Sequence, residues 1–451
     1  MKEKACYELS PAQDVPYLQC KYTIFKRVIN ILTSITIEGE VDFDLMKKAY
    51  NIVVERNDCL RIKFFKKGGK LMQYFRDDVK PLEKIPFHTF ETEGQQKAFI
   101  NKYRLATIKY LRGVVIEPTF IKTFDNKNMI LLKVCHLVLD TYGINNIYKD
   151  LLAVYNALKN GTDLPPSPPS YEEIIKKDLE KAANESLYEK HYDFFKNLLE
   201  DNPEPYYAGI HGPEIAPIQK LRAKNRRGCG MSLLFNYTKD YRHTINSDLV
   251  TRVLEYCKET QCSPANFLMY TCSLTTAKLN DNVKNVLPLG LYNNRISQNE
   301  KSCGGTKVQS IACYTKFNYK ASFEDNLKFF ISNQTKLYMH VGFKDRDFET
   351  LAHKIYRSPL LETYYGMSYS FVPLEMPEGV SFDMYSNGNG ALAAYIIQVF
   401  DPKTNEIRMA YDVQVNFTTE EHVAAFHDMY LNVIEQVLDN PAVLLKDITL
   451  E

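Results

Sequence analysis

The sequence lacks several features that would point to particular classes of protein. It has no tryptophan, and no run of about 18 apolar residues that could cross a membrane. Its N-terminal residues also lack the apolar centre of a signal peptide. Charge of one sign is not in excess, because 56 Lys and Arg stand against 55 Asp and Glu, for a net charge of +1. We therefore expect neither nucleic-acid binding nor attachment to an anionic membrane.

Metal-binding and cofactor-binding patterns are also missing. The ten cysteines form no Cys-x-x-Cys pair, and the nine histidines are not spaced with Cys or Asp as metal ligands. No glycine-rich loop of the Walker type is present, so no bound cofactor is expected. The cysteines lie in core-like segments, which predicts reduced, buried thiols and a cytoplasmic location.

The length of the chain and one proline-rich stretch predict its division into domains. A chain of 451 residues is too long for one simple core. Four prolines fall within residues 162–170, and proline keeps such a stretch out of helix and sheet. We therefore predict an N-terminal lobe at 1–170 and a C-terminal lobe at 171–451. Both contain alternating strands and helices, which indicates an α/β fold.

Hydrophobic periodicity predicts the elements of each lobe. In the first, strands are expected at 31–37, 62–65, 113–123 and 128–134, with helices at 43–54, 95–105 and 142–158. In the second, strands are expected at 285–291, 307–317, 367–372, 391–400 and 406–415. Helices are expected there at 171–199 (broken near 184), 248–260, 263–279, 323–339 and 418–438.

The stretch from Cys135 to Thr141 joins an imidazole, a carboxylate and the end of an apolar strand. His136 is expected where the strand gives way to a helix, and such junctions often support functional side chains. These residues alone favour the simpler interpretation, in which His136 is a hydrogen-bonded core histidine and Asp140 only caps the next helix. Because side chains alternate along a strand, Cys135 and His136 should point to opposite faces. A Cys-His nucleophile pair is therefore not expected, and Cys135 is predicted to be a buried thiol.

Six short motifs occur in order along the chain: Ser10-Pro11-Ala12-Gln13, Arg56 to Phe64, Cys135 to Thr141, Asn293-Asn294-Arg295, Asp345 to Glu349 and Arg357 to Leu360. In the same order they resemble the motifs S-x-A-Q, R-H-E-x-L-R-T-x-F, H-H-x-x-x-D-G, N-G-R, D-x-P-F-E and R-N-P-L-F. These belong to the condensation domains of nonribosomal peptide synthetases, in the chloramphenicol acetyltransferase superfamily. The resemblance extends over essentially the whole chain. It implies an α/β fold of two chloramphenicol-acetyltransferase-like lobes, arranged as a V-shaped pseudo-dimer. A segment of the second lobe near residues 380 to 400 would cross to the first.

The resemblance also implies roles for individual residues. His136 would be the catalytic base or a hydrogen-bond acceptor that positions the amine. Asp140 would be a structural anchor paired with an arginine, with Arg295 as the first choice and Arg61 as the second. The backbone amide of Thr141 would polarise the thioester carbonyl, and Tyr142 would line the tunnel unless it belongs to the core.

The strand Ile311 to Lys316 departs from the I-G-x-F-V-N of the family, and two positions of the Cys135 to Thr141 motif also depart from the family pattern. Cys135 replaces the first histidine of the motif, and Thr141 replaces its glycine. A β-branched residue restricts the backbone and occupies space, so Thr141 could narrow the channel or weaken activity. Cys135 would then lie beside the tunnel as an unreactive thiol.

The reaction that the resemblance implies is formation of an amide bond from a carrier-bound acyl or aminoacyl thioester and an amine. The phosphopantetheine arm would come from a carrier protein acting in trans on a free-standing, monomeric domain, since no adenylating or carrier domain is recognised in the chain. One alternative is an ester-forming or coenzyme-A-dependent acyltransferase of the same superfamily. Another is a degenerate, non-catalytic protein that only docks carriers.

Overall fold

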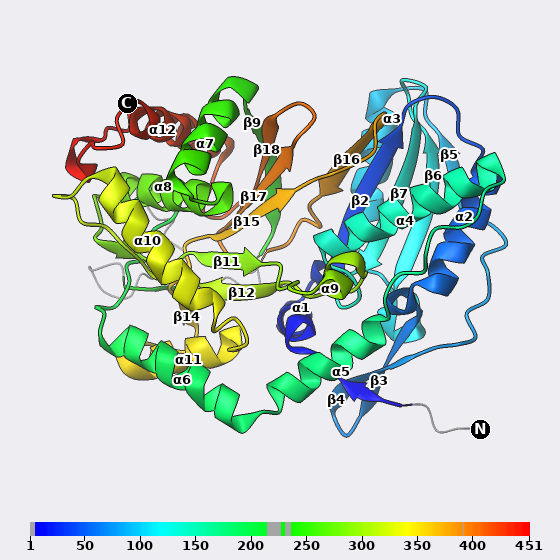
Figure 1. Ribbon diagram of the computed structural model, residues 1–451, viewed down its shortest axis with the longest axis horizontal. Coiled ribbons are helices and arrows are strands. Elements are labelled where there is room, and N and C mark those ends of the chain that lie inside the picture. Colours follow the sequence, from blue (N-terminus) through cyan, green and yellow to red (C-terminus); the bar gives the residue numbers. More distant parts are fainter. Residues whose placement is uncertain (1–4, 214–226, 231–235, 391) are drawn as a thin grey trace. The chain divides into compact units, whose positions relative to one another are not determined.

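The computed structural model describes residues 5–213, 227–230, 236–390 and 392–451. It contains two compact units. Figure 1 labels their helices and strands. Unit 1 comprises Met1–Asn184, Asn293–Val308 and Met376–Gly388, and unit 2 comprises Glu185–Tyr292, Gln309–Glu375 and Asn389–Glu451. Two short segments of the second half of the chain therefore belong to unit 1.

These bounds differ from the division expected at residue 170. Unit 1 continues to Asn184 because helix α5 (Tyr171–Ala182) packs on it. Asp58 accepts hydrogen bonds from the backbone N–H groups of Tyr171 at 2.8 Å and Glu172 at 3.1 Å, and so holds the first turn of this helix. The Tyr171 ring is fully buried. The later segment that returns to unit 1 is 376–388, near the start of the expected 380 to 400 region.

Unit 1 is built on a five-stranded sheet whose strand order is β16-β2-β7-β6-β5. Its strands are β2 (Asn30–Ile37), β5 (Phe87–Thr89), β6 (Ile116–Lys122), β7 (Asn128–Cys135) and β16 (Val380–Tyr385). All neighbours are antiparallel except β5 and β6. Every residue of the central strand β7 is buried, which explains its unbroken apolar sequence.

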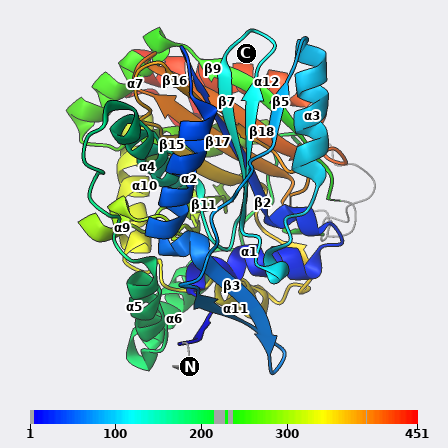
Figure 2. The ribbon, with the colours of Figure 1, turned by 90° about the vertical axis from the view of Figure 1, so that its right-hand side faces the viewer.

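Helices cover both faces of this sheet, as Figure 2 shows. They are α2 (Phe43–Arg56) and α4 (Thr141–Asn160) on one face and α3 (Glu93–Leu105) on the other. The hydroxyl group of Tyr148 on α4 lies 3.2 Å from that of Thr33 on β2. On the opposite face, Ile100 of α3 packs against Leu32, Met129 and Leu131. Because side chains alternate along β2 and β7, neighbouring residues of one strand pack against helices on opposite faces of the sheet.

A second, smaller sheet in unit 1 has the order β1-β4-β3. Its strands are β1 (Tyr7–Glu8), β3 (Ile62–Lys67) and β4 (Lys70–Phe75), and the helices α1 (Pro11–Tyr22) and α9 (Gln298–Ser302) complete the unit. The turn after Lys67 joins β3 to β4, with Gly68 and Gly69 both at positive φ. This left-handed conformation suits glycine because glycine has no Cβ.

Unit 2 has a six-stranded sheet of order β12-β11-β15-β17-β18-β9, with parallel pairs only at β11-β15 and β15-β17. Its strands are β9 (Thr238–Ile245), β11 (Leu289–Tyr292), β12 (Gln309–Ala312), β15 (Ser368–Pro373), β17 (Ala394–Asp401) and β18 (Glu406–Gln414). Short strands are β8 (Cys229–Gly230), β10 (Asn285–Val286), β13 (Thr315–Lys316) and β14 (Glu362–Thr363). Its helices are α6 (Glu185–Glu200), α7 (Ser247–Thr260), α8 (Pro264–Leu279), α10 (Phe323–Tyr338), α11 (Asp345–Tyr356) and α12 (Glu420–Asp439).

Most predicted elements are present, and the differences have local causes. The strand expected at 285–291 is divided into β10 and β11, with Leu287 and Pro288 between them. Pro288 has no N–H to donate to a neighbouring strand, which explains why the strand is interrupted at this point. Likewise, the strand expected at 307–317 is divided into β12 and β13, and β9, β16 and α11 were not predicted. Within the described ranges, no helix is both long enough and apolar enough to cross a membrane.

Candidate active site

The site lies in unit 1, in the turn that connects β7 to α4. The strand ends at Cys135, and the backbone N–H of His136 donates to the carbonyl of Ile29 at 2.8 Å. The N–H of Val138 donates back to Cys135 at 2.8 Å and closes the turn. Asp140 then caps α4, since its Oδ1 accepts from the N–H of Gly143 at 2.7 Å. The predicted strand-to-helix junction at His136 is confirmed.

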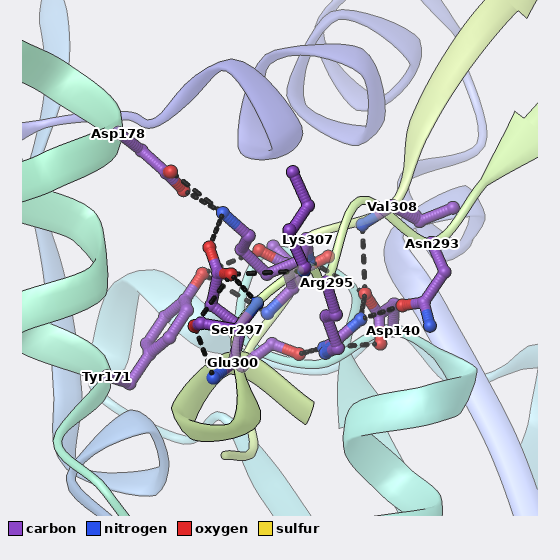
Figure 3. Close-up of polar contacts among 12 residues, drawn as sticks. Asp140, Tyr171, Asp178, Asn293, Arg295, Ser297, Glu300, Lys307 and Val308 are labelled. Atoms are coloured by element: carbon purple, nitrogen blue, oxygen red, sulfur yellow. Dashed lines mark hydrogen bonds and ion pairs between the residues drawn. The ribbon is translucent and has the colours of Figure 1, made fainter. Parts of the chain in front are cut away.

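Asp140 forms a two-pronged ion pair with Arg295, shown in Figure 3. Arg295 Nη1 lies 2.9 Å from Asp140 Oδ2, and Nη2 lies 3.0 Å from Oδ1. The two side chains are 0% and 4% exposed, so the pair is screened from water. Arg295 was the first choice of partner. Arg61, the second choice, instead has a carboxylate of Asp77 at 3.9 Å, and that carboxylate is 86% exposed.

Asp140 also accepts hydrogen bonds from three backbone N–H groups. These are Gly143 at 2.7 Å, Lys307 at 2.7 Å and Val308 at 3.0 Å. Burial alone would raise the pKa of Asp140, but the charge and hydrogen bonds of Arg295 and the backbone bonds from Lys307 and Gly143 lower it below its usual value. Both carboxylate oxygens are thus engaged with donors. With both oxygens engaged and its pKa lowered, Asp140 is poorly placed to take a proton.

His136 has one nitrogen that is shielded from solvent. The residue is partly exposed, whereas its Nδ1 is buried and makes no hydrogen bond of normal geometry in the described part of the chain. Burial lowers the pKa of the imidazole, and weaker interactions with backbone groups of His136 and Leu139 and with the Asp140 charge act against this effect. Since the ordinary pKa is near 6.5, the ring is neutral at pH 7. A neutral imidazole can accept a proton.

Thr141, which stands where the family has glycine, begins helix α4. It is not among the described non-glycine residues with positive φ, so its backbone does not need glycine at this position. Its side chain is partly exposed, with Oγ1 3.9 Å from Sδ of Met384 on β16. The substitution therefore adds a methyl and a hydroxyl group beside β16 without backbone strain.

Tyr142 lies over the buried ion pair. The guanidinium carbon of Arg295 is 4.8 Å from the centre of the Tyr142 ring, a distance at which a cation is attracted to the ring face. The residue is partly exposed. Tyr142 thus contacts Arg295, the ion-pair partner of Asp140. Tyr142 was expected to line the tunnel or to belong to the core, and neither expectation included this contact.

Cys135 is fully buried at the end of β7. Its N–H donates to the carbonyl of Val115 at 2.9 Å, and burial raises the pKa of its thiol far above the ordinary value. A thiol held neutral in this way is a poor nucleophile. The structure thus agrees with the prediction of a buried thiol.

Sequence reasoning missed several residues that support this turn. The side chain of Gln13 donates to the carbonyl of Leu137 at 2.7 Å, and Lys307 binds Asp140 through its backbone. Gln13 belongs to the opening motif, which was a usable signal, whereas nothing in the sequence distinguished Lys307 from other lysines. Across the described residues, no group of three or more His, Cys, Asp or Glu side chains is placed to hold a metal ion.

Known proteins resemble this chain in sequence and in fold. The model of the family described as "Condensation domain" matches residues 3–208. Among solved structures, a variant of the starter condensation domain of rhizomide synthetase is similar with a TM-score of 0.81 and 15% identity, covering 99% of this chain and 98% of that one. The first condensation domain of the calcium-dependent antibiotic synthetase has a TM-score of 0.82 and 13% identity, covering 99% and 100%. The resemblance to condensation domains is confirmed: residues 3–208 match the family in sequence, and the whole chain has the fold.

Curated relatives are far longer than this chain. Surfactin synthase subunit 2 of Bacillus subtilis is 20% identical over 454 aligned residues, which cover 98% of this chain and 12% of that protein. Bacitracin synthase 3 of Bacillus licheniformis is 25% identical over 228 residues, covering 48% of this chain and 4% of that protein. The chain thus spans a small part of each of these relatives.

Proposed function

We propose that this protein is an acyltransferase that forms an amide bond between a carrier-bound acyl or aminoacyl thioester and an amine, in nonribosomal peptide biosynthesis. The observation that carries the proposal is the partly exposed His136, set in a turn whose Asp140 is paired with Arg295. The family match over residues 3–208 and the relatives that make nonribosomal peptides support it.

His136 acts on the amine in this proposal. With Nδ1 buried, the other ring nitrogen, Nε2, is the one available to a substrate. It accepts a proton from the amine, or orients the amine by a hydrogen bond, as the nitrogen attacks the thioester carbonyl. Holding both reactants at this turn makes the step effectively unimolecular. The products are the amide and the free thiol of the carrier arm.

The start of α4 would stabilise the negative charge that develops on the thioester oxygen. The N–H of Thr141 is in the first turn of the helix, where backbone donors have no partner within the helix. No acceptor for it is found among the described residues. An amide fixed in this way is suited to an oxyanion, because it need not reorient during the reaction.

The partners in this proposal are an acyl or peptidyl carrier protein, bound transiently, and the amine acceptor. The carrier's phosphopantetheine arm supplies the thioester, and the reaction uses no other cofactor. The protein is proposed to act as a monomer in the cytoplasm. Nine of the ten cysteines are buried, as is typical of reduced thiols that act as small apolar residues.

An intact-mass assay tests this proposal. A carrier protein loaded with an acyl group is mixed with a panel of amines, and the wild-type protein is compared with His136→Ala and with His422→Ala, an exposed histidine at the start of α12. We expect amide product with the wild type and with His422→Ala, and a loss of at least about a hundredfold with His136→Ala.

Other outcomes would point to the alternatives. Ester product with alcohol acceptors, or turnover of acyl-coenzyme A without a carrier, would support the other acyltransferase activities. Carrier unloading that is absent, or equal in wild type and His136→Ala, would contradict a catalytic role and leave carrier docking as the function.

A further inference from the structure

Lys307 is a buried cation at the far end of the segment 293–308. Its side chain is 2% exposed, and its Nζ lies 2.7 and 2.8 Å from the two oxygens of Asp178 on α5. Nζ also lies 3.1 Å from Glu300 Oε1 on α9. Figure 3 shows the ammonium group between these two carboxylates. This cluster involves the side chain of Lys307, whereas Asp140 binds its backbone N–H, so the cluster takes no direct part in the chemistry proposed above.

Glu300 joins the two ends of the segment. Its Oε1 contacts Lys307, whereas its Oε2 accepts hydrogen bonds from the N–H groups of Ile296 at 3.1 Å and Ser297 at 2.8 Å. The Ser297 hydroxyl group donates to the same oxygen at 2.9 Å. Ile296 directly follows Arg295. One carboxylate therefore ties the residues next to Arg295 to the residue whose backbone binds Asp140.

The backbone between these ends lines the Asp140 site. The carbonyl of Gly305 accepts from Arg295 Nη2 at 2.9 Å. The hydroxyl group of Tyr171 donates to the carbonyl of Thr306 at 2.8 Å and accepts from its N–H at 3.1 Å. Lys307 and Val308 then donate their N–H groups to Asp140. A shift of this backbone would remove two of the five donors that hold the Asp140 carboxylate.

We propose that Lys307, Asp178 and Glu300 form a second anchor of this segment and are positioning residues for His136, acting through the Lys307 and Val308 backbone on Asp140. The expected effect of the variants on turnover rests on the proposed function. The anchoring of residues 293–308 is inferred from the contacts alone. Removing the cation would leave two largely buried carboxylates, Asp178 and Glu300, without their counter-charge. The segment would then loosen where it meets Asp140.

The test compares four variants. Lys307→Met removes the cation, Lys307→Arg keeps it, and Asp178→Asn weakens the anchor from the α5 side. Lys301→Met is the matched control, because Lys301 is an exposed lysine next to Glu300 on the short helix α9. If Lys307→Met does not fold, Asp178→Asn still tests the anchor, since it removes one charge and leaves Glu300 in place.

Hydrogen–deuterium exchange of the backbone is measured first, on wild-type protein and each variant without substrate. We expect the amides of residues 303–308 to exchange at least about tenfold faster in Lys307→Met and Asp178→Asn, with partial recovery in Lys307→Arg and no change in Lys301→Met. Unchanged exchange in both Lys307→Met and Asp178→Asn would overturn the anchor.

Turnover separates positioning from stability. With the acyl-carrier assay, we expect kcat to fall about tenfold or more in Lys307→Met while KM changes less than about twofold. Faster exchange with unchanged kcat would overturn the positioning role.

If the wild type shows no turnover, the proposed function fails, and the pKa of His136 is measured instead from exchange of its ring C–H. Loss of the Lys307 charge is then expected to raise that pKa, and an unchanged pKa would overturn the positioning role.

Discussion

The side-chain amide of Gln13 donates to the backbone carbonyl of Leu137 at 2.7 Å, joining residues 124 positions apart in the sequence. Gln13 also exchanges hydrogen bonds with Gln73, at 2.9 and 2.7 Å. Both side chains are fully buried. The turn that carries His136 is therefore supported by a residue of the first helix, which precedes it in the sequence, as well as by Arg295, which follows it.

Replacing Gln13 should loosen this turn. Gln13→Ala leaves the buried carbonyl of Leu137 without this donor and removes both hydrogen bonds to Gln73, which costs about 1–3 kcal/mol. We expect a lower free energy of unfolding in urea and a lower kcat. Gln19→Ala, on the same helix but only partly buried, is the control. Equal unfolding free energies for the two variants would contradict a supporting role for Gln13.

The two arginines that were candidates for Asp140 should differ in their effect on stability. Arg295→Ala leaves a buried carboxylate without its cation and should cost about 3–5 kcal/mol. Arg61→Ala removes a contact with the exposed Asp77 carboxylate and should cost far less. Urea unfolding of both variants measures the difference, and comparable losses would argue against Arg295 as the dominant partner.

Restoring the glycine of the family motif should show whether activity is limited by the backbone freedom of residue 141 or by the volume of its side chain. The backbone there is helical and does not require glycine. Thr141→Gly and Thr141→Ala should therefore have rates within about twofold of each other, since both remove the same obstruction beside Met384. Steady-state turnover measures this. A gain confined to Thr141→Gly would show that backbone freedom is limiting.

Activity should depend on pH through His136. Burial lowers its pKa below 6.5, and the neutral ring is the active form in the proposed reaction. We therefore expect kcat/KM to rise with pH through a midpoint below 6.5 and to be level near pH 7. A profile of kcat/KM between pH 5 and 8 checks this. A midpoint above 7 would contradict a buried, neutral imidazole as the base.

The Glu300 carboxylate should contribute to stability in a defined acidic range. Although burial acts to raise its pKa, hydrogen bonds from Ser297 and the charge of Lys307 lower it to about 2. A carboxyl whose pKa is depressed by folding stabilises the native state above its unfolded pKa of 4.5, and this contribution is lost as pH falls toward about 2. The unfolding free-energy difference between wild type and Glu300→Gln should thus shrink from pH 5 to pH 2.5.

The same comparison with Glu435→Gln serves as the control, since Glu435 is exposed on α12. Its difference from wild type should stay nearly constant over this range. A constant difference for Glu300→Gln as well would contradict the depressed pKa.

Much of unit 1 could be predicted because its elements have strong local signals. The apolar run of β7 and the helical spacing after Tyr142 place the junction at His136. Motif order supplied Arg295 as the partner of Asp140 across 155 positions, which no local pattern could have done. By contrast, β16 was missed because only one of its six residues is buried, so its sequence lacks the apolar pattern of a covered strand.

The rest of the site depends on backbone groups and on distant side chains. Two donors to Asp140 are N–H groups of Lys307 and Val308, and any residue type except proline would supply the same donors. The lobe boundary was misplaced because prolines 165 to 169 mark a loop, while α5 beyond them still packs on unit 1. Linker composition shows where the chain is extended, but not which core the next helix joins.

The two returning segments of unit 1 have a consequence for how the chain folds during synthesis. Residues 293–308 and 376–388 supply Arg295, Lys307 and the strand β16, and all are made after most of the N-terminal part has left the ribosome. Until then Asp140 has no cation and β2 has an open edge, which is prone to wrong pairing. An N-terminal fragment limited to the matched residues 3–208 should therefore be aggregation-prone, and the native core must wait for the later segments to be synthesised.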